Sequence, residues 1–237
     1  MAIEMEAVMV PTMVLVADDA NDSHRARSLH DLADAVAGRG EAPVVPAFGS
    51  RKEVQRELDA VTGPKVVVPA YVAGGCVDSA GLYASLDLGA GAPPEGGVCA
   101  TAPLGAVPSL VADLAGRLAE RGWEPGDGVV LAADGGESAE ERQAVAEVAR
   151  MLSRRLRAPV QVGYVTAWAP TVADAVERLR SADTGRVAVA AWRLVADADF
   201  DRLRALDAVV TPPLWPSENV VDTLLAQHRA ATARLAV

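Results

Sequence analysis

Short runs rich in valine and alanine alternate along the chain with longer segments in which hydrophobic residues recur at helical spacing. The short runs predict buried strands, and the longer segments predict amphipathic helices. A strand, a crossover helix and a parallel strand in turn are typical of α/β proteins. For the first half we expect strands at 12–17, 43–48, 65–72 and 97–102, and helices at 23–40, 51–63 and 107–122.

The same order restarts after a short stretch with glycines and a proline between Gly122 and Gly128, which predicts a linker. For the second half we expect strands at 128–133, 159–165, 186–194 and 207–211, and helices at 137–157, 170–182, 198–205 and 217–234.

Matching segments in the two halves indicate an internal duplication. VLVADD at 14–19 aligns with VLAADG at 130–135, and APVVPAF aligns with APVQVGY at the same offset of about 116 residues. We therefore predict an α/β protein of two similar halves, each a roughly four-stranded parallel sheet flanked by helices. The expected domains are residues 1–122 and 123–237.

Composition and charge narrow the classes of partner. Of the 237 residues, 51% are hydrophobic, which is enough to bury a core in each half. The net charge of −10 would repel a phosphate backbone, so we expect neither a nucleic acid nor an anionic membrane as partner. Glu4 and Glu6 lie where a signal peptide needs positive charge, and no apolar run is long enough to span a bilayer. We expect a cytoplasmic protein.

Side chains that can take part in catalysis or ligand binding follow the predicted strands. In parallel sheets ligands bind beyond the carboxyl ends of the strands, where Asp18, Asp19, Asp134, Cys76 and Asp78 are found. Aromatic residues also lie in or just after strands: Phe48, Tyr71, Tyr164, Trp168, Trp192 and Trp215. The pattern predicts a cleft with flat apolar walls and acidic corners. The alternative is that the aspartates are helix N-caps and that the aromatic rings belong to the core.

Several standard motifs are missing. There is no GxxxxGK[ST] sequence and no GxSxG sequence, and the glycine-rich GAGAPPEGG is interrupted by Pro94. Cys76 and Cys99 have neither a CxxC spacing nor a second pair, so we expect two small buried thiols. His24 and His30 are six residues apart on one predicted helix, on different faces, which is not the spacing of a two-histidine metal site. His24 alone lies near Asp18 in the sequence.

Four segments together resemble the sirohydrochlorin cobaltochelatase and ferrochelatase family of cobalamin and siroheme synthesis. The segments are VLVADDANDS, VVVPAYVAGG, APLGAVPSLVADLAGRL and APTVADAVERLR, and the resemblance covers nearly the whole chain. It implies two fused α/β halves that hold a tetrapyrrole in the cleft between them, with Co, Fe or Ni as the inserted metal substrate. It also implies that the helix ending each half packs onto the other half.

The histidines on which the family's chemistry rests are replaced in this chain. The family's His-Gly-Ser triplet falls on Asp18, Asp19 and Ala20, and its second histidine falls on Val77, or on Cys76 if the alignment slips by one residue. A further histidine, often present after the APLG segment, falls on Val107.

These replacements matter because imidazole suits Co(II), Fe(II) and Ni(II) and can accept a pyrrole proton near neutral pH. Valine can do neither, although Asp18 can accept a proton or bind a hard cation and a Cys76 thiolate can bind a soft one. We expect ordinary chelatase activity to be weak or absent. By resemblance, the candidate catalytic residues are Asp18 and Asp78, and the candidate metal ligands are Asp18 and Cys76. The candidate ligand-binding residues are Asp19, Tyr71, Val77, Trp168, Trp192 and Trp215.

Three functions remain open. The chain could be a divergent chelatase that uses Asp18, Cys76 or Asp78, or a repurposed enzyme acting on another flat ligand. It could also be a non-catalytic binding or scaffold protein. The fold alone does not choose among them.

Overall fold

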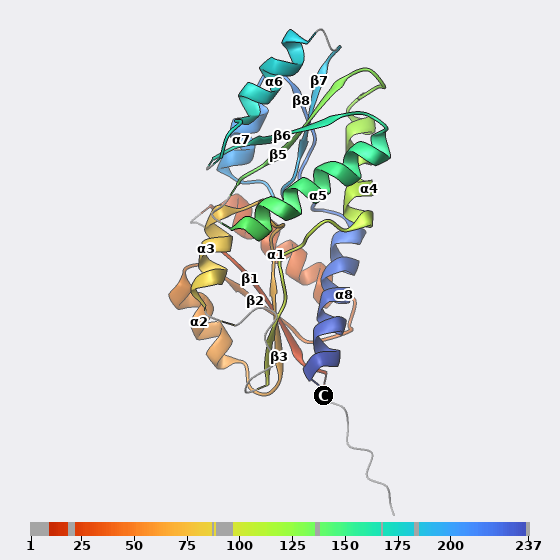
Figure 1. Cartoon of the computed structure of the whole chain (residues 1–237). Helices are drawn as coiled ribbons and strands as arrows, with labels where there is room; N and C mark the ends of the chain where they lie inside the picture. The colour runs from red at the N-terminus through yellow and green to blue at the C-terminus, as the bar shows by residue number, and fades with distance from the viewer. Residues whose placement is uncertain are drawn as a thin grey trace, which may run out of the picture.

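The computed structural model describes residues 10–18, 22–86, 88, 97–135, 138–166, 168–182 and 185–235. Within these residues the chain forms two α/β halves, one above the other in Figure 1. The first half contains β1 (Thr12–Ala17), α1 (Ser23–Ala37), β2 (Val44–Phe48), α2 (Arg51–Ala60), β3 (Lys65–Pro69), α3 (Val77–Ser85), β4 (Val98–Ala100) and α4 (Pro108–Glu120). The second half contains β5 (Gly128–Ala133), α5 (Ala139–Leu156), β6 (Val160–Tyr164), α6 (Val172–Ser181), β7 (Val187–Ala191), α7 (Ala198–Arg204), β8 (Val209–Val210) and α8 (Glu218–Leu235).

Each half contains one parallel sheet of four strands. The strand order is β2-β1-β3-β4 in the first sheet and β6-β5-β7-β8 in the second, so the two halves repeat one topology. The predicted fold class is confirmed. The division into domains at residue 122 stays a prediction.

Helix α3 was not expected from the sequence. Strand β3 ends at Pro69, and the segment that follows turns at Gly74 and Gly75 before α3 begins. The sequence VDSAGLYAS contains serine and glycine, which are weak helix formers. Its helical pattern of hydrophobic residues extends over only nine residues. Tertiary packing compensates, because Leu82 and Tyr83 of this helix are buried against the first sheet.

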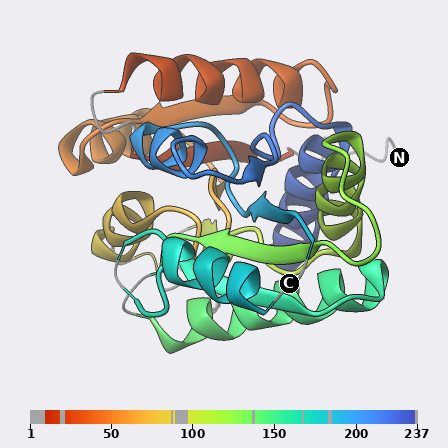
Figure 2. The same cartoon turned by 90° about the horizontal axis from the view of Figure 1, so that it is seen from above.

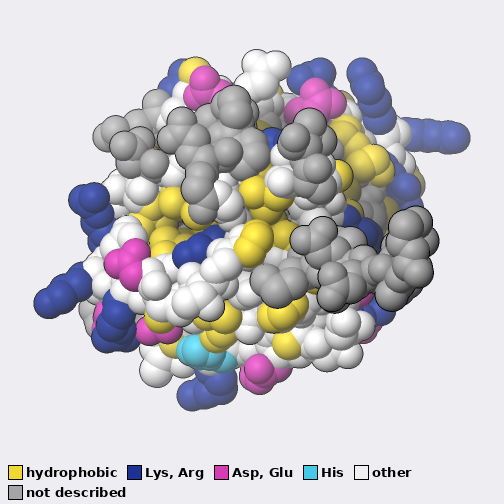
Figure 3. Space-filling view, turned by 90° about the horizontal axis from the view of Figure 1, so that it is seen from below, with side chains coloured by type: hydrophobic (Ala, Val, Ile, Leu, Met, Phe, Trp, Pro, Cys, Tyr) yellow, Lys and Arg dark blue, Asp and Glu magenta, His cyan; other side chains and the backbone are white. Residues whose placement is uncertain are grey.

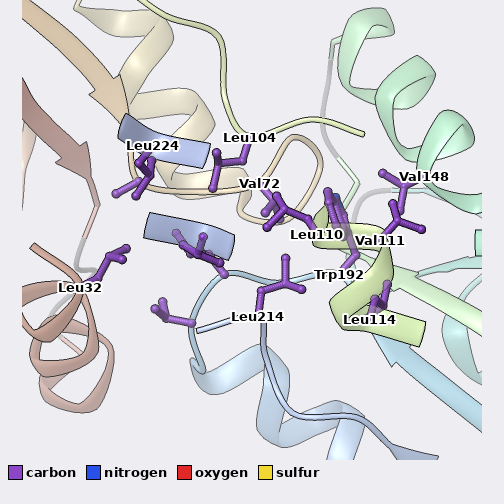
Figure 4. Close-up of a cluster of buried hydrophobic side chains, with 14 of the residues drawn as sticks. Leu32, Val72, Leu104, Leu110, Val111, Leu114, Val148, Trp192, Leu214 and Leu224 are labelled. Carbon is purple, nitrogen blue, oxygen red and sulfur yellow. The ribbon is translucent and has the colours of Figure 1, made fainter. Parts of the chain in front are cut away.

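Alternating residues of each strand contribute to different cores, as the two-residue period of a strand requires. In β1, Val14 and Val16 face the cluster beneath α2 and α3, whereas Met13 and Leu15 face a larger cluster that continues into the second half. Figure 4 shows part of this shared cluster, with side chains from both halves packed together. The two sheets are therefore held by one continuous apolar core between them.

The last helix of each half packs on the other half, as the resemblance implied. Helix α8 lies beside α1, β3 and β4, while α4 lies beside α5 and β7. This exchange is visible in Figure 1, and Figure 2 shows the same helices from above.

A buried histidine ties the end of the chain to its beginning: Nε2 of His228 in α8 lies 2.9 Å from the main-chain oxygen of Pro11. The first sheet thus depends on a helix that is distant in the sequence.

The surface carries charges of both signs. On the face seen from below, hydrophobic side chains gather near the middle, and Lys, Arg, Asp and Glu side chains are spread around the rim (Figure 3). No helix within the described residues is both long and apolar enough to span a membrane.

Candidate functional site

A cleft of about 670 Å³ lies between the two halves, at the carboxyl ends of the strands. Residues of both halves line it: Asp22, Arg25, Cys76, Val77 and Asp78 from the first, and Asp134, Val165, Thr166, Asp197, Ala198, Asp199 and Arg202 from the second. The lining contains five aspartates and two arginines, so the cleft is acidic when all of these groups are ionised.

The segment between β3 and α3 connects the two halves at the bottom of the cleft. The ring nitrogen Nε1 of Trp192 donates to the main-chain oxygen of Ala73 at 2.9 Å, and the main-chain N–H of Asp134 donates to the oxygen of Gly74 at 2.7 Å. Gly74 has φ +69°, and a side chain at Gly75 would press on the main-chain oxygen of Trp192. The close approach of two backbones requires glycine here. Cys76, Val77 and Asp78 are thereby presented to the cleft.

Arg25 is the central cation of the first half's side of the site. It lies in the first turns of α1, whose N-cap Asp22 accepts the main-chain N–H groups of His24 and Arg25. The guanidinium is 4% exposed, and each of its nitrogens has an acceptor. Burial acts to lower the pKa of Arg25, but the charges of Cys76, Asp197 and Asp18 outweigh it and raise this pKa.

Arg193 is the corresponding cation of the second half and is fully buried. Its Nη1 donates to Oδ2 of Asp197 at 2.6 Å, its Nη2 is paired with Asp134, and Oδ2 of Asp199 lies 3.7 Å from Nη2. Asp197 is also the N-cap of α7 and accepts from Nη1 of Arg25 at 3.0 Å. One carboxylate therefore joins the two arginines across the cleft.

Asp134 is the most perturbed carboxyl group of the cleft. It directly follows β5 and is 2% exposed. Burial raises its pKa to about 7, and nearby Asp197 and Asp199 act in the same direction. Arg193 and the main-chain N–H of Val77, both donors to the carboxylate, act to lower this pKa. A carboxyl group with a pKa near neutrality can take up and release protons under ordinary conditions.

The structure brings together some of the residues expected from the sequence. Cys76, Val77 and Asp78 line the cleft. The main chain of Asp18 lies at its edge, donating its N–H to Oγ of Ser79 at 3.0 Å and accepting from Nε of Arg25 at 2.8 Å. Asp19 lies outside the described residues.

The expected aromatic walls lie elsewhere. Tyr71 is buried beneath the cleft, where it packs edge to face on Tyr83. Trp192 is fully buried in the core that the halves share (Figure 4). Trp168 packs on Tyr164 and under Arg142, and Trp215 lines a separate hollow beside Arg117 and Pro216. These four rings are not among the residues that line the cleft, so their contact with a ligand stays a prediction.

Several site residues were missed from the sequence. Asp134 was noted at a strand end but was not assigned a role, and Arg25, Arg193, Asp197 and Asp199 were not singled out. One signal was available for Arg193, because it follows the buried run VAVAAW, where an arginine requires acidic partners. The other residues are of types common at the surface, and of these Arg25 and Asp199 lie on predicted helices.

Within the described parts of the chain, the possible metal-binding side chains do not gather at one point. Among the described residues, no three or more His, Cys, Asp or Glu side chains are arranged to hold a metal ion. Cys76 and Cys99 are both free and buried.

Comparisons with known proteins agree with this architecture. Residues 128–192 match the family model CbiX. The structure of SirB from Bacillus subtilis with Fe³⁺ superposes with a TM-score of 0.70 at 13% identity, covering 94% of this chain and 96% of that one. The sirohydrochlorin chelatase SirB from Bacillus subtilis subspecies spizizenii, in complex with cobalt, gives a TM-score of 0.66 at 10% identity, covering 95% and 96%.

A third similar structure belongs to a larger protein. DR2241 from Deinococcus radiodurans, a multi-domain protein with structural similarity to chelatases and two additional domains, gives a TM-score of 0.60 at 23% identity. The match covers 92% of this chain and 54% of DR2241. No curated protein matches the sequence. The CbiX match covers residues 128–192 of the second half, and nearly the whole chain shares the fold of the SirB structures.

Proposed function

We propose that this chain binds a flat small molecule, such as a tetrapyrrole, in the cleft between its halves, and that ordinary insertion of Co, Fe or Ni is weak or lost. The observation that carries the proposal is the cleft itself, which both halves line at the carboxyl ends of their strands. Its volume of about 670 Å³ lies in the range of small-molecule sites. The shared fold with SirB, described as a sirohydrochlorin chelatase, supports a ligand of this chemical class.

The residue types at the cleft support the second part of the proposal. Asp18 and Val77 or Cys76 stand where the family's histidines are expected, so the imidazoles that suit these metals are replaced. The carboxylates of the lining can also accept hydrogen bonds from ligand N–H groups, such as those of pyrrole rings. A cytoplasmic location remains part of the proposal on the strength of the sequence.

A blocking substitution tests the binding site. Ala198 lines the cleft at the start of α7, and Ala173 is an exposed residue in the first turn of α6 that does not line it. Metal-free sirohydrochlorin is titrated into each protein and followed by absorbance. We expect Ala198→Trp to weaken binding by roughly tenfold or more and Ala173→Trp to leave it unchanged. Equal affinity of both variants and the wild type, or absence of binding by the wild type, would contradict the proposal.

A repurposed enzyme is the second candidate, and Asp134 is the observation that favours it. A buried carboxyl with a pKa of about 7 at the wall of a cleft has the properties of a general acid or base. In that case a cleft ligand would be converted without any metal, and Asp134→Asn would abolish the conversion while leaving binding largely intact. Binding with no conversion by the wild-type protein would instead favour a binding or scaffold protein.

A further inference from the structure

The side chain of Arg25 is held on four sides at the bottom of the cleft. Its Nε donates to the main-chain oxygen of Asp18 at 2.8 Å, and its Nη2 donates to Sγ of Cys76 and to Oγ of Ser79, both at 2.9 Å. Its Nη1 donates to Asp197 of the other half at 3.0 Å. The guanidinium thus lies between the main-chain oxygen of Asp18 and the sulfur of Cys76. These are the two residues that the sequence offers as metal ligands.

We infer that the Arg25 guanidinium occupies the position that a divalent metal ion would need next to the sulfur of Cys76, and that this buried cation keeps metal out. This inference deepens the proposed function, on which it rests for the identity of the site, by naming the residue that sets its specificity. Arg25 is a specificity-determining residue because it uses the acceptors that a metal would use.

Space is the first reason. A metal bound to a thiolate lies about 2.3 Å from the sulfur. A metal bound to Cys76 on the side that faces Asp18 would therefore lie in the volume that the guanidinium fills, since Nη2 is 2.9 Å from Sγ and Nε donates to the main-chain oxygen of Asp18. The metal can bind there only if Arg25 leaves.

Charge is the second reason. Arginine stays protonated in proteins, and a divalent cation next to this buried guanidinium would be repelled strongly where few water molecules screen the charges. The acidic groups that would attract a metal are already engaged, because Asp197 pairs with both Arg25 and Arg193, and Asp134 pairs with Arg193.

The anchoring of Arg25 is the third reason. Ser79 is fully buried, and its Oγ accepts from both the Asp18 N–H and Nη2 of Arg25. Displacing the guanidinium would remove one donor each from Ser79, Cys76 and Asp197 in a buried site, which costs free energy at each group. Ligand entry alone therefore leaves Arg25 in place.

Cobalt binding without any tetrapyrrole tests this inference. Co(II) is titrated into wild-type protein and into Arg25→Gln, Arg25→His and Arg25→Lys, and thiolate-to-cobalt charge-transfer absorbance is recorded. We expect no such band for the wild type or for Arg25→Lys, which keeps the charge. The uncharged Arg25→Gln should gain the band, with an affinity for Co(II) higher by roughly tenfold or more. Adding Cys76→Ser should remove the band.

The outcomes separate clearly. A Cys76-dependent cobalt band in the wild-type protein would overturn the inference. So would a folded Arg25→Gln, checked by circular dichroism, that gains no cobalt binding. If Arg25→Gln does not fold, Arg25→His decides in the same way, because its imidazole replaces the cation with a ligand that suits Co(II). The cobalt titration contains no tetrapyrrole, so a negative result would not bear on whether the protein binds sirohydrochlorin. Equally, a protein that does not bind sirohydrochlorin could still show the predicted cobalt binding.

Discussion

At the scale of single residues, Asp134 shows how the structure changes the meaning of a side chain. In the sequence it is one more aspartate at the end of a strand. In the structure it is buried between the main chain of one half and an arginine of the other, and its pKa is raised to about 7. An aspartate can therefore titrate in the pH range in which a histidine normally does.

The raised pKa gives a prediction about stability and pH. An unfolded aspartate ionises near pH 3.9, so between about pH 4 and pH 7 the folded state holds a proton that the unfolded state has released. The stabilising contribution of Asp134 is present below pH 4 and is lost as pH rises toward 7. We expect the free energy of unfolding of the wild type to fall relative to that of Asp134→Asn over this range.

Urea unfolding of both proteins at several pH values between 5 and 8 measures this difference. Asp31→Asn is the matched control, because Asp31 is exposed on α1. A difference between wild type and Asp134→Asn that is constant with pH would show that Asp134 is ionised throughout.

At the scale of elements, the segment between β3 and α3 holds the halves together through its backbone. Gly74 has φ +69°, and a Cβ there would strike Val145 of α5. A Cβ at Gly75 would lie 2.8 Å from the oxygen of Trp192 and would strike Val72. We expect Gly74→Ala and Gly75→Ala to lower the free energy of unfolding by roughly 1–3 kcal/mol each, because the packed core cannot move aside.

Gly116 of α4 provides the contrast. It is exposed within a helix, and a Cβ there meets nothing within 4 Å. Gly116→Ala should raise the free energy of unfolding by about 0.5–1 kcal/mol through helix propensity. Urea midpoints compare the three variants, and equal effects at all three positions would refute the role given to this segment.

The exchanged helices give a second prediction at this scale. Leu224 of α8 and Leu114 of α4 are fully buried, and each helix packs on the half to which it does not belong in sequence. We expect Leu224→Ala and Leu114→Ala to cost roughly 2–5 kcal/mol each. Hydrogen exchange should accelerate in β3 and β4 for Leu224→Ala and in β7 for Leu114→Ala. Faster hydrogen exchange in β7 for Leu224→Ala and in β3 and β4 for Leu114→Ala would contradict this packing of α8 and α4.

At the scale of the whole molecule, we expect the protein to bind sirohydrochlorin without inserting metal into it. With purified protein, sirohydrochlorin and Co(II), we expect insertion no faster than in the protein-free control, because the resemblance places Asp18 and Val77 or Cys76 where imidazoles would bind the metal. Binding depends on the cleft and should persist. Absorbance of the cobalt product measures insertion. Fast insertion by the wild type that Asp18→Ala abolishes would make Asp18 a working replacement for histidine.

Rescue of insertion would need more than the missing ligands. Histidine substitutions at Asp18 and Val77 would supply only the imidazoles that the resemblance assigns to these positions, while Arg25 still contacts the main-chain oxygen of Asp18 and the sulfur of Cys76. We therefore expect Asp18→His with Val77→His to restore little insertion unless Arg25→Gln is added, because the surrounding groups also set metal affinity.

The sequence by itself determined the fold class, the repeat of two halves and the strand ends at which the cleft lies. These follow from hydrophobic periodicity, which is a local property, and from the rule that parallel sheets bind ligands at their carboxyl ends. The sequence did not reveal α3, which contains weak helix formers and is stabilised by the burial of Leu82 and Tyr83.

Only the tertiary structure decided which charges meet in the cleft. Arg25 and Asp197 are 172 residues apart in the chain, and Arg193 and Asp134 are 59 apart. Nothing local distinguishes these residues from surface charges. They become a buried network because the packing of α1, α3 and α7 removes water from around them, and buried charges remain ionised only when they are paired.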